Sequence, residues 1–271
     1  MSNLAYFPLA DDLIAGATVT VITEDVDYPQ EKLQNIPMAD TARATEDTSP
    51  PGNIVQVQIT FDVAKNPRAW FFLNHNILGG DWTIYSSDGP AGPWGIIQSQ
   101  TVTHRRYDTK FYGTEWLAPS RWFVVEFPAA CTYSPEDFWE MGKILCGNDI
   151  TEFSKGFSPG IERGLGFDNI HNETEFGVIW SYIKRARIQY LGMSWDPHLR
   201  VPVLAELEDF IETTYGGAYP SVIIPDNVNR ADLYYMKNKD ELRWNEEAAR
   251  GLIASCKLDF KEMSRGQVQT A

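Results

Sequence analysis

Apolar and polar residues alternate along one stretch in the first quarter of the chain, residues 53–61. Its apolar members are Val55, Val57, Ile59 and Phe61, and the residues between them are Gln56, Gln58 and Thr60. A period of two predicts a strand with one buried side and one solvent-facing side. A polar break at 65–67 and a wholly apolar segment at 69–73 follow. This order predicts the core of a β-sandwich.

Strand-like segments continue at regular spacing, and turns rich in glycine and proline separate them. They comprise residues 17–22, 53–61, 69–73, 81–86, 94–102, 110–116, 121–127 and 138–147. Short strands spaced in this way are typical of an antiparallel β-sandwich of the jelly-roll type. We therefore expect a mainly β protein whose first domain, residues 1–150, consists of an N-terminal arm and a jelly roll.

Residues 151–271 are predicted to form a second β-rich domain that contains one helix, at 202–215. Val203, Leu207, Phe210 and Ile211 fall on one face of that helix. Pro202 and the Gly216–Gly217 pair are typical start and stop signals. Further strands are expected at 179–193, 221–224, 232–236 and 254–260. The acidic, proline-rich segment 24–52 and the polar tail 264–271 are predicted to be arms that become ordered on assembly.

Charge and cysteine content exclude several classes of protein. The 271 residues carry a formal net charge of −14, which disfavours a nucleic-acid partner because such proteins need concentrated lysine and arginine. The three cysteines are too few and too widely spaced for a disulfide framework. No segment reaches the roughly 20 apolar residues of a membrane span, and the first residues lack signal-peptide features. We expect a protein made in the cytoplasm.

The sequence contains no catalytic or cofactor signature. The four histidines form no ligand-spaced pair, so no metal site is predicted, and His75 is expected to be structural. There is neither a nucleophile elbow nor a nucleotide-binding glycine motif, so no cofactor is expected and the protein is predicted not to be an enzyme. A glycan hydrolase remains an alternative; its carboxylate pair could come from Glu136, Asp137 and Glu140 or from Glu173 and Glu175.

Five motifs in order carry a resemblance to a known family. They are Ile-x-Phe-Asp, Asn-His-Asn, Trp-x-Ile-Tyr-x-Ser-Asp, Arg-Trp-Phe-Val-Val-Glu and Met-Gly-Lys-Ile-Leu-Cys-Gly, and the resemblance that they carry covers residues 10–150. This order resembles the galactose-binding-like (discoidin-type) jelly rolls of bacteriophage tail and baseplate proteins. The resemblance implies a structural, non-enzymatic component of a phage tail tip or baseplate, located in the virion. The resemblance implies as partners other tail or baseplate proteins, attached fibres, and copies of the chain itself in a cyclic oligomer of three or six.

Aromatic residues around the turns of the jelly roll suggest a second hypothesis. Exposed aromatic rings can stack on sugars, so the domain could instead be a carbohydrate-binding module that contacts glycans of the host surface. The same rings could also contact neighbouring subunits. The candidate glycan or subunit contacts are Trp82, Tyr85, Trp94, Tyr107, Tyr112 and Trp116.

Overall fold

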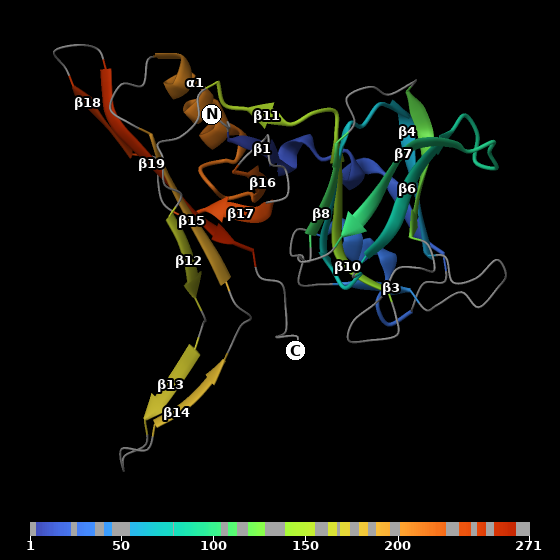
Figure 1. Cartoon of the computed structure of the whole chain (residues 1–271), viewed down its shortest axis with the longest axis horizontal. Coiled ribbons are helices and arrows are strands. Elements are labelled where there is room, and N and C mark those ends of the chain that lie inside the picture. Colours follow the sequence, from blue (N-terminus) through green and yellow to red (C-terminus); the bar gives the residue numbers. More distant parts are fainter. Residues whose placement is uncertain are drawn as a thin grey trace. The chain divides into compact units, whose positions relative to one another are not determined.

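The computed structural model divides the chain into two compact units, of which one is continuous and the other is split (Figure 1). The sandwich unit is Asp11–Asp149, and the split unit combines Met1–Ala10 with Ile150–Thr270. The structure describes residues 4–22, 26–35, 41–44, 55–77, 79–103, 108–112, 119–127, 139–154, 162–166, 169–173, 179–183, 188–195, 201–225, 233–239, 243–247 and 252–263.

The sandwich unit is the predicted antiparallel β-sandwich. Its five-stranded sheet has the order β2-β4-β9-β6-β7 and its four-stranded sheet the order β3-β10-β5-β8. The strands are β2 (Thr18–Val21), β3 (Ala42–Ala44), β4 (Val55–Lys65), β5 (Ala69–His75), β6 (Gly79–Ser87), β7 (Gly95–Thr103), β8 (Asp108–Tyr112), β9 (Ser120–Phe127) and β10 (Trp139–Gly147). Two short 3-10 helices, η2 (Ile14–Gly16) and η3 (Gln30–Gln34), pack against it.

Aromatic rings join the two sheets of the sandwich. The indole of Trp82 on β6 lies 4.7 Å from the ring of Phe127 and 5.4 Å from that of Phe72, centroid to centroid. Phe127 in turn lies 5.6 Å from Trp139. These edge-on and tilted contacts bury large apolar area and fix the spacing of the sheets. His75 is also buried, with its ring 5.1 Å from Trp82, so its surroundings are those of a core residue.

The segment predicted to be an assembly arm instead belongs to the sandwich in its described parts, residues 26–35 and 41–44. Leu33 is fully buried in the core, and β3 pairs with β10. The Gln34 side chain donates to the carbonyls of Ile14 and Ala17 at 2.7 and 2.9 Å. The expectation was wrong here because a few buried positions between prolines suffice to anchor irregular backbone. The other expected arm, 264–271, lies outside the described residues.

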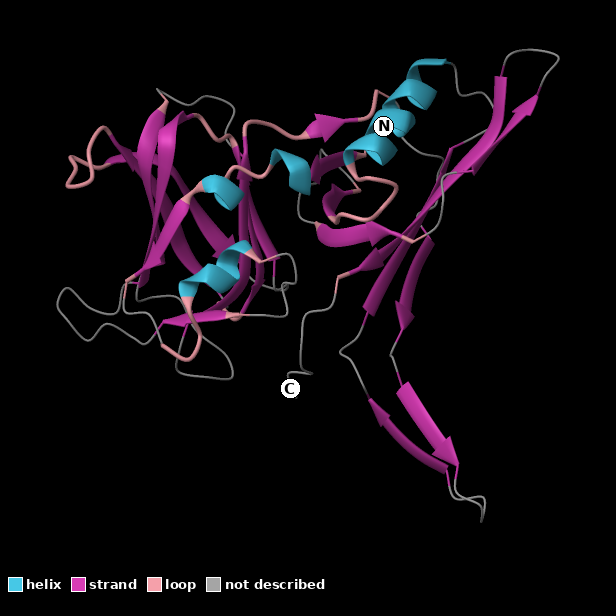
Figure 2. Ribbon diagram, turned by 180° about the vertical axis from the view of Figure 1, so that it is seen from behind, coloured by secondary structure: helices cyan, strands magenta, loops and turns pink. Residues whose placement is uncertain are grey.

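In its described residues, the split unit contains an eight-stranded sheet, one α-helix and a hairpin outside that sheet; Figure 2 shows the helix in cyan and the strands in magenta. The sheet order is β11-β1-β16-β17-β19-β15-β12, with β18 also paired to β19, and β13 and β14 pair with each other. The elements are β1 (Ala5–Pro8), η1 (Leu9–Asp11), β11 (Thr151–Glu152), β12 (Glu162–Gly166), β13 (Asn169–Glu173), β14 (Ile179–Ile183), β15 (Ile188–Trp195), α1 (Val201–Thr213), β16 (Ser221–Ile224), β17 (Tyr234–Asn238), β18 (Arg243–Glu247) and β19 (Leu252–Glu262).

The helix α1 covers one face of this sheet with the apolar stripe that the sequence predicted. Leu207 and Phe210 are buried with Met236 and Phe260 of the strands below. Tyr6 of β1 packs edge-on against Phe210 at 4.7 Å. In the described part of the chain no helix has the length and apolar character to cross a bilayer.

The first ten residues fold with the C-terminal half, although 1–150 was predicted to be one domain. β1 pairs antiparallel with β16 through four residues and with β11 through Ala5↔Glu152 and Tyr6↔Thr151. The sandwich unit is therefore inserted between two strands that are neighbours in the same sheet. In the described parts of 179–193, which was expected to be one strand, β14 pairs with β13 while β15 pairs with β12 and β19.

We call the contacts of Trp82 with Phe127 and Phe72 the aromatic junction. It predicts that substituting two tryptophans of the β6–β7 hairpin affects stability very differently. Trp82→Ala should lower the free energy of unfolding by about 3–5 kcal/mol, because it empties a fully buried aromatic site. Trp94→Ala, at a position that is 36% exposed, should change it by less than about 1 kcal/mol. Urea unfolding followed by tryptophan fluorescence measures both. Equal losses in the two variants would contradict the assignment of Trp82 as the junction.

Candidate functional site

The aromatic residues proposed from sequence do not form one group. Trp82 is fully buried, so the expectation that it contacts a glycan or a neighbouring subunit is wrong. Tyr85 lies half-buried on the outer face of the five-stranded sheet, and Trp94 lies exposed immediately before β7. Tyr107 and Trp116 lie outside the described residues. Tyr112 ends β8, and its side chain is not described.

The outer face of the five-stranded sheet brings Tyr85 of β6 together with residues from three other strands, β4, β7 and β9. Strand register places Thr83 opposite Glu126, Tyr85 opposite Val124, and Ser87 opposite Trp122. On the other side of β9, Gln56 of β4 is opposite Glu126. Because side chains alternate along a strand, these residues share the face that points away from the core. We call Gln56, Thr83, Tyr85, Ile96, Trp122 and Glu126 the outer-face patch.

Glu126 is the polar centre of the outer-face patch. Its carboxylate accepts a hydrogen bond from the Gln56 amide at 3.0 Å and a longer one from the Tyr85 hydroxyl at 3.4 Å. Partial burial and, second, the neighbouring Glu126 charge raise the pKa of Tyr85, so the phenol stays protonated and able to donate. A carboxylate, an amide and a phenol thus converge within one solvent-accessible cluster.

Apolar surface adjoins this polar centre. Ile96, opposite Tyr85 on β7, is 62% exposed. Trp122 of β9, opposite Ser87, is half-buried. The Arg121 guanidinium lies 5.1 Å from the centre of the Trp122 ring and donates to the Phe61 carbonyl, which steadies the indole. Val124 also faces outward but is only 5% exposed. It lies opposite Tyr85 and between Trp122 and Glu126 on the same face of β9.

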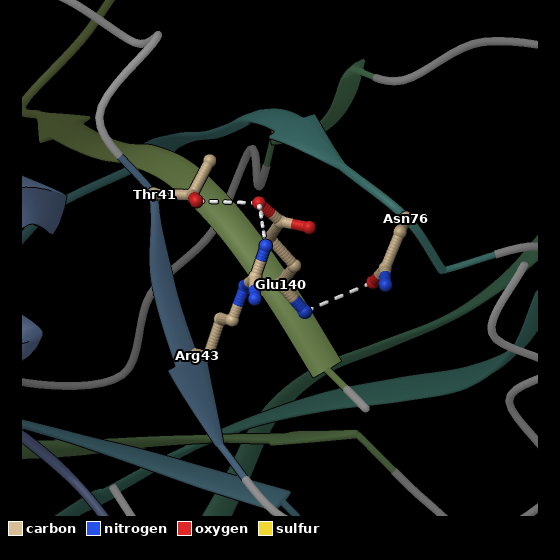
Figure 3. A network of polar contacts seen from close by, with 4 residues as sticks. All are labelled: Thr41, Arg43, Asn76 and Glu140. Atoms are coloured by element: carbon tan, nitrogen blue, oxygen red, sulfur yellow. Dashed lines mark hydrogen bonds and ion pairs between the residues drawn. The ribbon is translucent and has the colours of Figure 1, made fainter. Parts of the chain in front are cut away.

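A second polar network, around Glu140, has a structural explanation. Figure 3 shows Thr41 and Arg43 converging on the Glu140 side chain, and Asn76 on its backbone amide. The Arg43 guanidinium also lies 3.6 Å from the centre of the Tyr28 ring. The Thr41 and Arg43 contacts tie β3 and the residue before it to β10, and the Asn76 contact ties the end of β5 to β10. Glu140 is therefore engaged in holding the edge strand β3.

The structure does not place the side chains of the other acidic residues that a glycan hydrolase could use. Glu136, Asp137 and Glu175 lie outside the described residues, and the side chain of Glu173 is not described. Within the described part of the chain, no three histidine, cysteine, aspartate or glutamate side chains gather as a metal site.

One titratable cluster is buried in the sandwich unit. The Asp12 carboxylate accepts from the backbone amides of Ile14 and Cys146, both at 3.1 Å, through Oδ1. Lys143, 1% exposed, donates to the carbonyls of Gln34 and Asn35 at 3.1 and 2.8 Å. Burial raises the pKa of Asp12 to about 6, and the Lys143 charge and the two backbone amides limit the rise. Burial likewise lowers the pKa of Lys143.

No protein-family model matches the sequence, and no curated protein matches it either. Solved structures with a similar fold share little identity. One is chitosan-binding module 1 of a chitosanase/glucanase from Paenibacillus sp. IK-5, with 10% identity, 50% of this chain and 97% of that chain covered, and a TM-score of 0.40. Another is the family 32 CBM of C. perfringens NanJ in complex with galactose, with 9% identity, 53% and 98% coverage, and a TM-score of 0.40.

A third structure, the Ruminococcus gnavus GH29 fucosidase E1_10125 in complex with fucose, has 9% identity and a TM-score of 0.41. The match covers 52% of this chain and 27% of the fucosidase. With likeness this low, the jelly-roll assignment rests on the sheet order and register of the chain itself.

The raised pKa of Asp12 predicts a specific dependence of stability on pH. A carboxyl with a folded-state pKa near 6 and an unfolded value of 3.8 favours the folded state while protonated, and this contribution is lost as pH rises from about 4 to about 6. Asp12→Asn keeps an oxygen acceptor for both amides but does not titrate. Its stability relative to wild type should therefore increase by about 2 kcal/mol between pH 4 and pH 7.

Urea unfolding at several pH values measures this difference, and Asp62→Asn at an exposed position is the matched control. A difference between Asp12→Asn and wild type that stays constant over this range would show that Asp12 does not titrate as described.

Proposed function

We propose that the sandwich unit is a carbohydrate-binding module that acts without catalysis. The observation that carries this proposal is the outer-face patch, where the carboxylate–amide–phenol cluster of Glu126, Gln56 and Tyr85 adjoins the accessible ring of Trp122. Sugars present C–H faces that stack on aromatic rings and hydroxyls that need donors and acceptors nearby. The outer-face patch offers both on one rigid sheet.

Charge narrows the class of ligand. A formal net charge of −14 and the Glu126 carboxylate at the centre of the outer-face patch oppose an anionic polysaccharide. Neutral hexose-containing glycans are the ligands that we propose. Glu126 has its two hydrogen-bond donors already in place, so it would orient a sugar hydroxyl through its remaining acceptor capacity.

A glycan array probed with the full-length chain tests this proposal. We expect binding to at least one neutral glycan, and a loss of about tenfold or more in affinity for Trp122→Ala, since removing a stacked ring costs on the order of 1.4 kcal/mol. Tyr85→Phe, which keeps the ring and removes the donor, should give a smaller loss. Thr20→Ala, at an exposed position on β2, is the matched control on the same sheet.

Absence of binding to every neutral glycan on the array would contradict the proposal. Binding that Trp122→Ala and Tyr85→Phe leave unchanged would assign the activity to another surface.

We propose as a second candidate that the chain is a structural component of a larger assembly, namely the phage tail or baseplate that the motif order resembles. The observation that favours it is the hairpin β13–β14, which among the described residues pairs with no third strand. An isolated two-stranded hairpin is at best marginally stable in water. Docking on a second copy would complete it.

The oligomeric state tests this second candidate. We expect light scattering of the purified chain to show a closed ring of three or six copies, and a monomer when residues 168–184 are replaced by a short glycine–serine linker. Trp122→Ala serves as the control and should leave the ring intact. A wild-type monomer at every concentration, or a ring unaffected by the linker, would overturn it.

A further inference from the structure

The turn that follows α1 contains a tyrosine where a helix normally places glycine. The Gly216 amide donates to the Ile211 carbonyl at 2.8 Å and the Tyr215 amide to the Glu212 carbonyl at 3.0 Å. This pair of bonds is the Schellman motif, whose left-handed position is usually glycine. Here Tyr215 occupies that position with a φ of 51°. Gly216 and Gly217 continue in the left-handed region with φ values of 66° and 87°.

Packing does not explain the choice of tyrosine at position 215. Its side chain is 69% exposed, and the ring that it contacts, that of Tyr219 at 5.3 Å, is itself 43% exposed. A bulky residue in the left-handed region is strained, and no burial offsets that strain. Strained residues that persist without a packing role concentrate at functional sites.

Two buried polar side chains lie beneath this turn. Asn238 is 8% exposed and Ser221 is 2% exposed. In the described structure no group hydrogen-bonds either amide atom of Asn238 or the Ser221 hydroxyl. The Asn238 Cβ lies so near Gly217 that a Cβ added there would be 2.9 Å from it. Buried polar groups are nearly always paired, so three unpaired atoms in one place indicate a site that a polar molecule completes.

Strand register brings these polar residues together. Ser221 is directly opposite Met236, and Asn238 follows two residues later on the same face of β17. That face is the one that α1 covers, since Met236 belongs to the apolar cluster with Leu207 and Phe210. The ends of α1, β16 and β17 therefore meet where the two exposed tyrosines stand.

We propose that the tyrosine turn, residues 214–219, forms with Ser221 and Asn238 a second binding site, for a neutral sugar ring. The rings of Tyr215 and Tyr219 would contact the C–H face of the sugar. The Asn238 amide supplies one donor and one acceptor, which matches two adjacent hydroxyls, and Ser221 can take either role. Gly216 leaves room for the ring, since a Cβ added there would have no neighbour within 4 Å.

A sugar fits this place better than a peptide. Both strands below the turn are interior to the sheet, with β16 between β1 and β17 and β17 between β16 and β19. No strand edge is therefore open here for an added peptide strand. The proposal concerns the split unit and does not rest on the outer-face patch of the sandwich unit.

Saturation-transfer NMR on the full chain tests the site with D-galactose, D-glucose and N-acetyl-D-glucosamine, each at millimolar concentration. The experiment uses the Trp122→Ala protein to weaken binding at the outer-face patch, so that signal lost on a further substitution in the tyrosine turn reports that turn. We expect transfer to at least one of the three sugars, and a loss of at least about tenfold in affinity on adding Tyr215→Gly or Tyr219→Ala.

The melting temperature separates function from packing. Glycine adopts the left-handed conformation without strain. Tyr215→Gly should therefore leave Tm unchanged or raise it, while sugar binding is lost. A lowered Tm with unchanged binding would show that Tyr215 serves the fold, and would overturn the proposal. No transfer to any of the three sugars in the Trp122→Ala protein would also overturn it.

Discussion

The sandwich unit depends on one aromatic junction, in which Trp82 contacts Phe127 on its own sheet and Phe72 on the facing sheet. The junction fixes more than the spacing of the sheets. Once Trp82 and Ile84 point inward, alternation forces Thr83 and Tyr85 outward. The same holds on β9, where Phe127 inward sets Glu126 outward. The composition of the outer-face patch is thus a consequence of the core, and a register slip would exchange the two.

The longer strands of the sandwich could be predicted because their apolar residues alternate, as in β4, or run without a break, as in β5, and because turns with glycine or proline separate them. Shorter elements could not. β1 and β3 have four and three residues, too few to show a period, and tertiary pairing decides them. Trp82 was wrongly predicted to be an exposed contact, although the sequence of its strand indicates burial. Trp82 and Ile84 share one face and alternate with Asp81 and Thr83. Nearness to a turn favours exposure, but for Trp82 the alternation along the strand is the better predictor.

The candidate site was only partly visible in the sequence. Tyr85 and Trp94 could be named because they are aromatic and close to a turn. Glu126 and Gln56 could not, because they are separated by 70 residues and meet only through the register of β4 and β9. For the tyrosine turn, the sequence predicts the position but not the backbone conformation. The Tyr-Gly-Gly string marks a helix end, but the structure shows which of its members occupies the left-handed position.

The pairing of β1 with β11 gives this protein an unusual order of events during synthesis. About 140 residues separate the two strands, so at roughly 5–20 residues per second the ribosome needs on the order of ten seconds to supply the partner. Through that interval the whole sandwich emerges and can fold, while the first strand has an edge and no neighbour. The nascent chain thus carries an unpaired first strand attached to a folded domain. Chaperones or rapid pairing protect the open edge of that strand from pairing with another chain.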